Sequence, residues 1–135
     1  MATLTVPAQT EQVDILQDLL HQQLDETGCS MAIALQLELV VEEAFVNIAT
    51  HAYTQPGGTA TFTCEVDRTA RQIMLRFKDQ GIPFDPLQSP DPDTTLKADE
   101  RKIGGLGIYL IKKTMDKCEY VYEQGSNILT AWKKY

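Results

Sequence analysis

The apolar residues of this 135-residue chain change their spacing along the sequence, and that change limits the folds open to it. Between residues 10 and 53 they recur at three- and four-residue intervals, as on one face of a helix. Two pairs of β-rich segments then follow, at 59–77 and 120–134. Strands that arrive in pairs beside helices predict an α+β fold: a two-layer sandwich with a mostly antiparallel, mixed sheet of about five strands under a layer of three helices.

The first part of the chain is expected to supply one strand and two helices. Residues 3–7 form the strand, and Thr10 is expected to cap a helix that is ended by Gly28. Ser30 is expected to cap a second, longer helix that runs to about Tyr53.

A long segment without periodicity, residues 79–104, divides the second part of the chain and is rich in proline, aspartate and threonine. Such loops are uncommon in a compact domain unless they are functional lids or disordered, so a lid is predicted at about 84–104. Helix is expected again from Leu106 to about Asp116. The closing hairpin is expected to turn at residues 125–127.

Composition excludes several classes of function. The net charge of −7 argues against a nucleic-acid partner, since a polyanion is bound by Lys and Arg. Three cysteines without a C-x-x-C pair suit a reducing compartment better than a disulfide framework. No charged leader opens the chain and no apolar run reaches about 18 residues, so we expect a cytoplasmic protein without membrane contact.

Polar side chains interrupt the apolar second helix at regular intervals. Glu43, Asn47 and His51 follow one another at four-residue spacing, which places them within one arc of the helix. The solvated stripe of an ordinary amphipathic helix has the same pattern. Asn is a poor helix former, however, and solubility alone favours Lys or Glu, so a ligand site on this stripe is the alternative.

Two glycine-containing motifs follow the stripe. In DQG at residues 79–81, the Asp79 carboxylate can accept a hydrogen bond from a ligand amine and Gly81 leaves room for a ring, although the motif is also common in plain turns. GGLG at 104–107 enters a helix whose free N–H groups favour an anion, or is a simple glycine-rich helix start. The sequence has neither a P-loop nor a Rossmann glycine motif, and His21 and His51 lack zinc-site spacing.

In this order, the three segments resemble the GHKL superfamily of ATP-binding domains found in gyrase, histidine kinases and mismatch-repair ATPases. VVEEAFVNIATHAY is similar to its N-box, DQGIPFDP to its first glycine box and GGLGIYLIKKTMD to its second. The resemblance to its stand-alone bacterial anti-sigma factor serine/threonine kinases covers nearly the whole chain. It implies that residues 1–135 form a single Bergerat-type domain that binds ATP or ADP with Mg²⁺.

The resemblance also implies roles for individual residues. Glu43 matches the general base of the family, and Asn47 matches the residue that coordinates Mg²⁺. Asp79 matches the carboxylate that recognises the adenine amino group, and Gly81 lets the base approach. The remaining members of the predicted nucleotide site are His51, Gly104, Gly105, Leu106 and Gly107.

Two positions depart from the family pattern. Pro83 stands where many members have a second glycine, which stiffens the hinge of the predicted lid. Arg101 and Lys102 precede the second glycine box where the sigma-factor kinases carry Glu-Arg, so either residue is a candidate phosphate contact.

Two functions are compatible with this resemblance. In the first, the protein is an Mg-ATP-dependent kinase that phosphorylates a serine or threonine of a small anti-sigma factor antagonist, and the unphosphorylated antagonist competes with a sigma factor for it. In the second, the same pocket binds ATP or ADP and changes the affinity for a protein partner without phosphate transfer. Either function is compatible with a homodimer. A clamp driven by ATP hydrolysis is disfavoured, because no transducer domain follows.

Overall fold

The computed structural model describes residues 1–88 and 106–135 of the chain. Its strands are β1 (Ala2–Pro7), β2 (Thr59–Asp67), β3 (Gln72–Asp79), β4 (Lys117–Glu123) and β5 (Ser126–Lys134). Its helices are α1 (Val13–Leu24), α2 (Met31–His51) and α3 (Leu106–Thr114), with short 3-10 turns η1 (Thr10–Gln12) and η2 (Pro86–Gln88).

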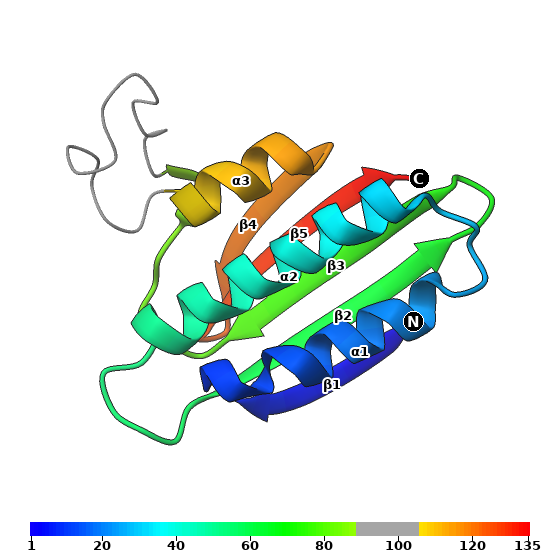
Figure 1. The fold of residues 1–135 in the computed structure, drawn as a ribbon. Coiled ribbons are helices and arrows are strands. Elements are labelled where there is room, and N and C mark those ends of the chain that lie inside the picture. Colours follow the sequence, from blue (N-terminus) through cyan, green and yellow to red (C-terminus); the bar gives the residue numbers. More distant parts are fainter. Residues whose placement is uncertain (89–105) are drawn as a thin grey trace, which may run out of the picture.

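The five strands form one sheet in the order β1-β2-β3-β5-β4, and the three helices cover one face of it (Figure 1). The predicted α+β sandwich is therefore confirmed. All four strand pairings are antiparallel, so the sheet is more regular than the mixed sheet that was expected. The reason is the position of β5. Strands β3 and β4 run in the same direction, but β5 lies between them and pairs antiparallel with both.

The hydrophobic core lies between the helical layer and the sheet. Its largest fully buried side chains include Phe45 of α2 and Phe62 of β2, and the ring of Phe62 stacks on Phe77 of β3 with centroids 5.2 Å apart. Residues of β3 alternate between this core and the opposite face, as expected for a strand with one covered side. Helices and sheet are thus held together by interdigitated apolar side chains.

The cap of α2 is confirmed, and the cap of α1 was predicted wrongly. The Ser30 hydroxyl accepts a hydrogen bond from the backbone N–H of Ile33 at 3.2 Å. Thr10 lies inside η1, and α1 begins at Val13 without a side-chain cap. A tertiary contact accounts for this start. The backbone N–H of Ala8 donates to the Gly58 carbonyl in the turn before β2, and the chain then forms η1 before α1 begins.

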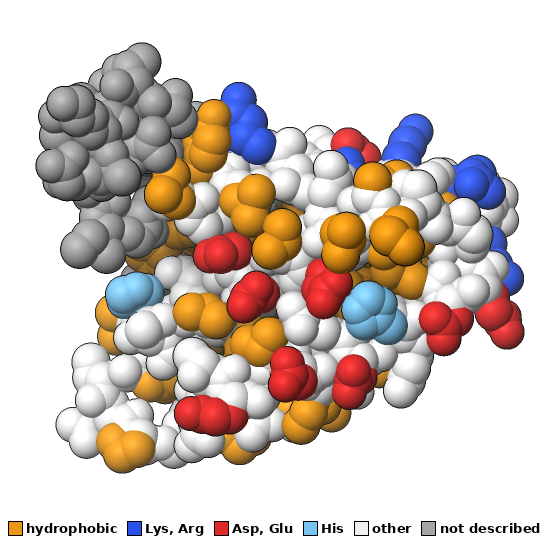
Figure 2. All heavy atoms as spheres, viewed as in Figure 1, with side chains coloured by type: hydrophobic (Ala, Val, Ile, Leu, Met, Phe, Trp, Pro, Cys, Tyr) orange, Lys and Arg blue, Asp and Glu red, His pale blue; other side chains and the backbone are white. Residues whose placement is uncertain are grey.

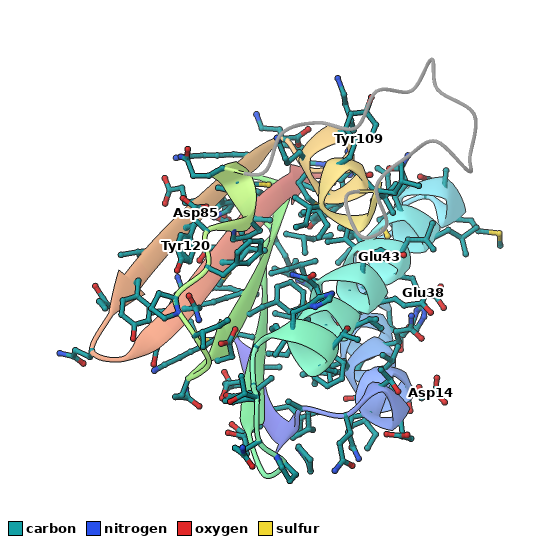
Figure 3. The ribbon with its side chains drawn as sticks, turned by 90° about the vertical axis from the view of Figure 1, so that its left-hand side faces the viewer. Asp14, Glu38, Glu43, Asp85, Tyr109 and Tyr120 are labelled. Atoms are coloured by element: carbon teal, nitrogen blue, oxygen red, sulfur yellow. The ribbon has the colours of Figure 1, made fainter. Side chains whose placement is uncertain are left out.

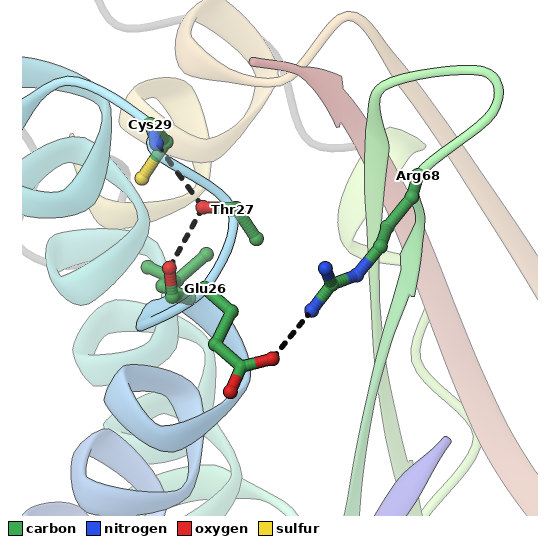
Figure 4. A network of polar contacts seen from close by, with 5 residues as sticks. Glu26, Thr27, Cys29 and Arg68 are labelled. Atoms are coloured by element: carbon green, nitrogen blue, oxygen red, sulfur yellow. Dashed lines mark hydrogen bonds and ion pairs between the residues drawn. The ribbon is translucent and has the colours of Figure 1, made fainter.

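The connection between α1 and α2 is stabilised by local polar contacts (Figure 4). The Thr27 hydroxyl donates to the Leu24 carbonyl at 2.7 Å and accepts from the Cys29 N–H at 3.1 Å. Glu26 forms a 3.1 Å ion pair with Arg68. The helix end predicted at Gly28 is wrong, because α1 ends at Leu24. Gly28 lies in the turn that follows and adopts a positive φ of 70°.

The closing hairpin turns earlier than expected. Glu123 pairs with Ser126, so the loop consists of Gln124 and Gly125, whose φ values are 51° and 77°. Two residues with positive φ give the turn type whose twist matches the flanking strands. The turn predicted at 125–127 is therefore wrong, and Asn127 lies inside β5 rather than in a loop.

The second part of the chain follows the expected order of elements where it is described, although α3 ends at Thr114 and β4 begins at Lys117, both earlier than expected. Helix α3 begins at Leu106 as predicted, and η2 occupies part of the segment expected to form a lid. The rest of that predicted lid, from residue 89 onward, lies outside the described residues. Among residues 1–88 and 106–135, no helix is both long enough and apolar enough to span a membrane.

Candidate functional site

A cavity of about 450 Å³ lies between α2, α3 and the ends of β3 and β5, a volume typical of small-molecule pockets. Most of its wall is apolar, with contributions from Ile48, Ile108 and Leu129. The polar side chains on its wall are Asn47, His51, Asp79, Tyr120 and Asn127. A mainly apolar cavity with a few polar groups is suited to bind a flat organic ring and to fix its orientation.

Among the described residues that line this wall, Asp79 is the one carboxylate, and it is 5% exposed. One of its oxygens, Oδ1, accepts hydrogen bonds from the Gly81 N–H at 2.8 Å and from Asn127 Nδ2 at 3.0 Å. The other oxygen, Oδ2, has no hydrogen-bond partner within residues 1–88 and 106–135. Asp79 lines the cavity, so an Oδ2 atom that faces it can accept a hydrogen bond from a ligand.

Asn127 organises the segment that follows Asp79. Its Nδ2 also donates to the Ile82 carbonyl at 2.9 Å, and its Oδ1 accepts from the Phe84 N–H at 3.0 Å and from the Tyr120 hydroxyl. One side chain of β5 therefore connects the carboxylate, the 82–84 segment and β4.

The phenol of Tyr120 is held in its neutral, donating form. Loss of hydration raises its pKa above the ordinary value, and the charges of Asp85 and Asp79 raise it further, against the lowering effect of a backbone hydrogen bond from Phe84. Figure 3 shows Tyr120 and Asp85 near each other beside the sheet, with Glu43 on α2 near α3. A neutral hydroxyl beside carboxylates can donate a hydrogen bond to Asn127 without adding a further negative charge.

Gly81 is required by packing against α2. A Cβ at this position would overlap the carbonyl carbon and oxygen of Ala52, and backbone atoms cannot move aside cheaply. The same Ala52 carbonyl accepts a hydrogen bond from the Ile82 N–H at 2.9 Å. The sequence predicted that glycine here leaves room for a ligand ring, whereas the described structure shows close approach to the end of α2.

The predicted stripe on α2 divides into two parts. Asn47 and His51 lie on the cavity wall, together with Asp79. Glu43 is not on that wall: its carboxylate lies against the start of α3, where a Cβ on Gly107 would overlap its Oε2 atom. The stripe therefore borders both the cavity and the entry to α3.

The second glycine box is only partly described. Leu106 is the first residue of α3 and is 46% exposed, and Gly107 follows it. Gly104 and Gly105 lie outside the described residues, as do the candidate phosphate contacts Arg101 and Lys102.

Sequence reasoning missed Asn127 and Tyr120. Asn127 was placed in a turn, and its position opposite Asp79 follows only from the pairing of β3 with β5. A signal was present in the alternation of β5, where an Asn occupies a core-facing position beside apolar neighbours. No group of three or more His, Cys, Asp and Glu side chains that might hold a metal occurs within the described residues.

Comparison with known proteins agrees with this architecture. Residues 6–133 match the sequence family described as a histidine kinase-like ATPase domain. The serine/threonine-protein kinase BtrW of Bordetella bronchiseptica is 33% identical over 101 residues, which cover 75% of this chain and 70% of that protein. The serine-protein kinase RsbW of Halalkalibacterium halodurans is 28% identical over 134 residues, covering 98% of this chain and 81% of that protein.

Solved structures share the fold at lower identity. A structure of the RsbU and RsbW domains of a Mycobacterium tuberculosis protein superposes with a TM-score of 0.64 and 12% identity, over 99% of this chain and 32% of that one. The histidine kinase domain of a blue-light activated kinase from Erythrobacter litoralis gives a TM-score of 0.59 and 15% identity, over 95% of this chain and 61% of that one. These likenesses concern the fold alone. The family match over residues 6–133 confirms the predicted GHKL resemblance: the chain belongs to the histidine kinase-like ATPase domain family.

Proposed function

We propose that the cavity binds the adenosine part of ATP or ADP, with Asp79 accepting a hydrogen bond from the adenine amino group. The observation that carries this proposal is the nearly buried Asp79 carboxylate, whose Oδ1 is fixed by the Gly81 N–H and by Asn127 while Oδ2 has no partner in the described part of the chain. An acceptor of this kind in an apolar wall suits a flat base that carries an amine donor. Membership of an ATPase domain family supports the choice of ATP.

The donor set also fits Mg²⁺ that is held mainly by the nucleotide and water. Asn47 offers a neutral amide oxygen on the cavity wall. Protein sites often hold Mg²⁺ through one or two side chains, with phosphates and several waters as the other ligands. In this proposal the Asn47 side chain would coordinate the ion, and the ion would offset the negative charge of the phosphates.

We further propose that the protein is a serine/threonine protein kinase whose substrate is a small anti-sigma factor antagonist, and that it thereby controls the availability of a sigma factor. The kinase names of its relatives support this proposal. The substrate hydroxyl oxygen bonds to the γ-phosphorus, the bond from that phosphorus to the bridging oxygen of ADP breaks, and Glu43 takes the hydroxyl proton. Glu43 lies one helical turn before Asn47, so the base and the metal ligand share one side of α2.

One observation favours a second candidate, a nucleotide-responsive binding switch. Glu43 is absent from the cavity wall and packs against Gly107 at the start of α3. In this candidate function Glu43 supports α3, and bound nucleotide changes the affinity for a protein partner without phosphate transfer.

Two substitutions on the same helix face distinguish the candidates. Asn47→Ala removes the proposed metal ligand, so Mg²⁺-dependent ATP affinity in calorimetry should fall at least about tenfold. Glu43→Ala should leave ATP affinity unchanged or slightly higher, because a negative charge near the phosphates is lost. In the Glu43→Ala variant, the rate of phosphorylation of an antagonist protein should fall by a factor of about 10² to 10⁴.

Glu43→Gln is the matched control, since it keeps the packing against Gly107 while removing the base. If it transfers phosphate at the wild-type rate, Glu43 is not the base and the kinase mechanism is wrong. If Glu43→Ala and Asn47→Ala both bind Mg-ATP normally, the α2 face is not part of a nucleotide site.

A further inference from the structure

Three large hydrophobic side chains are exposed in a row along the first half of α2. Met31, Leu35 and Leu39 follow one another at four-residue intervals and are 78%, 53% and 46% exposed. Residues four apart share one side of a helix, so the three side chains form an apolar ridge. Leu37 and Val41 of the same helix are fully buried, so α2 already presents another face to the core.

Acidic side chains flank the apolar ridge on the side that adjoins α1. Glu38 and Glu42 lie on α2 next to Leu39 in sequence or within one turn of it, and Asp14 and Asp18 lie on the neighbouring helix α1. Figure 3 shows Asp14 and Glu38 on the side of the helical layer that faces away from the sheet. In Figure 2, acidic and hydrophobic side chains alternate across the middle of the helical face, whereas Lys and Arg side chains appear near its edge.

The charge of this face follows from an uneven distribution along the sequence. Residues 1–67 contain ten of the 19 Asp and Glu residues and no Lys or Arg, so all 12 Lys and Arg residues follow residue 67. Helices α1 and α2 therefore carry negative charge that neither helix compensates. His21 of α1 can supply a positive charge only when it is protonated, and its Nε2 lies 3.7 Å from Glu38 Oε2.

We propose that the apolar ridge and its flanking carboxylates dock a cationic amphipathic helix of a partner protein. Apolar side chains of that helix pack on Met31, Leu35 and Leu39, and Lys or Arg residues along its edges lie opposite Glu38 and Glu42. Amphipathic helices commonly bind other proteins by packing their apolar face on an apolar surface. Complementary charges beside that surface then determine which partner binds.

Charge also decides against other occupants. A second copy placed symmetrically on this surface brings two acidic faces together, and a nucleic acid or an anionic membrane meets the same repulsion. The proposal does not depend on the nucleotide site, because no ridge residue lies on the cavity wall.

A pair of synthetic peptides tests the proposal. Each peptide, about 15 residues long, carries leucine at helical spacing, and the polar positions are all Lys in one peptide and all Glu in the other. Fluorescence anisotropy should show that the wild-type protein binds the Lys peptide at least about tenfold more tightly than the Glu peptide. Leu35→Ser with Leu39→Ser should weaken binding of the Lys peptide at least about tenfold. Glu38→Lys with Glu42→Lys should reverse the preference between the two peptides.

Val121→Ser is the matched control, because Val121 is 45% exposed on β4, away from the helical layer. It should leave binding of the Lys peptide unchanged, and circular dichroism should show that each variant is folded. If the Leu35→Ser and Leu39→Ser protein does not fold, the charge-reversed variant still decides the question.

Three results would overturn the proposal. The first is equal binding of the Lys peptide by the wild type and the charge-reversed variant. The second is a wild-type dimer in sedimentation that the serine variant converts to monomer, which assigns the ridge to a second copy. The third is binding to anionic phospholipid vesicles as tight as binding to the Lys peptide. ATP binding by these variants, measured separately, should remain normal, so failure here is distinguishable from failure of the proposed nucleotide site.

Discussion

Replacing Asn127 by Ala should damage both the stability of the protein and its nucleotide site. The substitution removes an amide that donates to Asp79 Oδ1 and to the Ile82 carbonyl, and that accepts from the Phe84 N–H and the Tyr120 hydroxyl. These groups lie at the end of β3, in the segment after it and on β4. No other side chain in the described residues is shown to bond to all of them.

The size of the effect follows from these contacts. A hydrogen bond to a charged group is worth about 1.5–3 kcal/mol and a neutral one about 0.5–1.5 kcal/mol. Asn127 is 7% exposed, but the groups left behind border the cavity, so water can replace part of what is lost. We expect the free energy of unfolding to fall by about 2–4 kcal/mol. ATP affinity should fall at least about tenfold, because Asp79 loses one of the two contacts that fix its Oδ1 atom.

Urea unfolding followed by circular dichroism measures the first quantity, and calorimetry with ATP measures the second. Tyr120→Phe is the matched control: it removes only the hydroxyl that donates to Asn127, so a loss of about 1 kcal/mol or less is expected. A fall in stability of less than about 1 kcal/mol in Asn127→Ala, together with unchanged ATP affinity, would refute the organising role of this side chain.

Two further substitution and labelling experiments follow from the geometry. Gly81→Ala should lower the free energy of unfolding by about 2–3 kcal/mol because its Cβ overlaps the Ala52 backbone. Gly28→Ala has open space but a positive φ, so about 1 kcal/mol is expected there, and equal losses would contradict the packing argument. Burial raises the pKa of the Cys64 thiol from 9.0 to about 12, so at pH 8 a thiol reagent should label Cys29 but reach Cys64 only on unfolding. Because the folded pKa is the higher one, stability should also fall as pH rises between these values, and rapid native-state labelling of Cys64 would show that its burial is wrong.

The sequence predicted the features that depend on local chemistry. The periodicity of α2, the Ser30 cap and the two pairs of strands were found as expected, except that β4 begins at Lys117 rather than at residue 120. The prediction failed at Thr10, where a hydrogen bond between Ala8 and the distant turn before β2 decides how the chain enters α1. The closing hairpin also turns earlier than expected, because Gln124 accepts a left-handed conformation that its residue type does not suggest.

The candidate site was predictable to a similar extent. Asp79, Asn47 and His51 were named from their motifs, and the fold places all three on one cavity wall. Asn127 escaped notice because its partner Asp79 is 48 residues away, and only the register of β3 with β5 brings them together. Gly81 was named for ligand access, but its contact with Ala52 arises from packing between distant segments that no local pattern encodes.

The central claim is that Asp79 recognises the adenine base, and calorimetry of Asp79→Asn with ATP tests it most directly. Asparagine keeps the shape of the side chain and one oxygen for Gly81 and Asn127, but it presents an NH₂ donor to the cavity in place of the Oδ2 acceptor. Loss of a hydrogen bond to a charged group predicts a fall in ATP affinity of about tenfold to a hundredfold. Asp85→Asn, which changes a nearby carboxylate that bonds the Leu87 N–H, should have no such effect. Wild-type ATP affinity in Asp79→Asn would contradict the claim and place the nucleotide elsewhere.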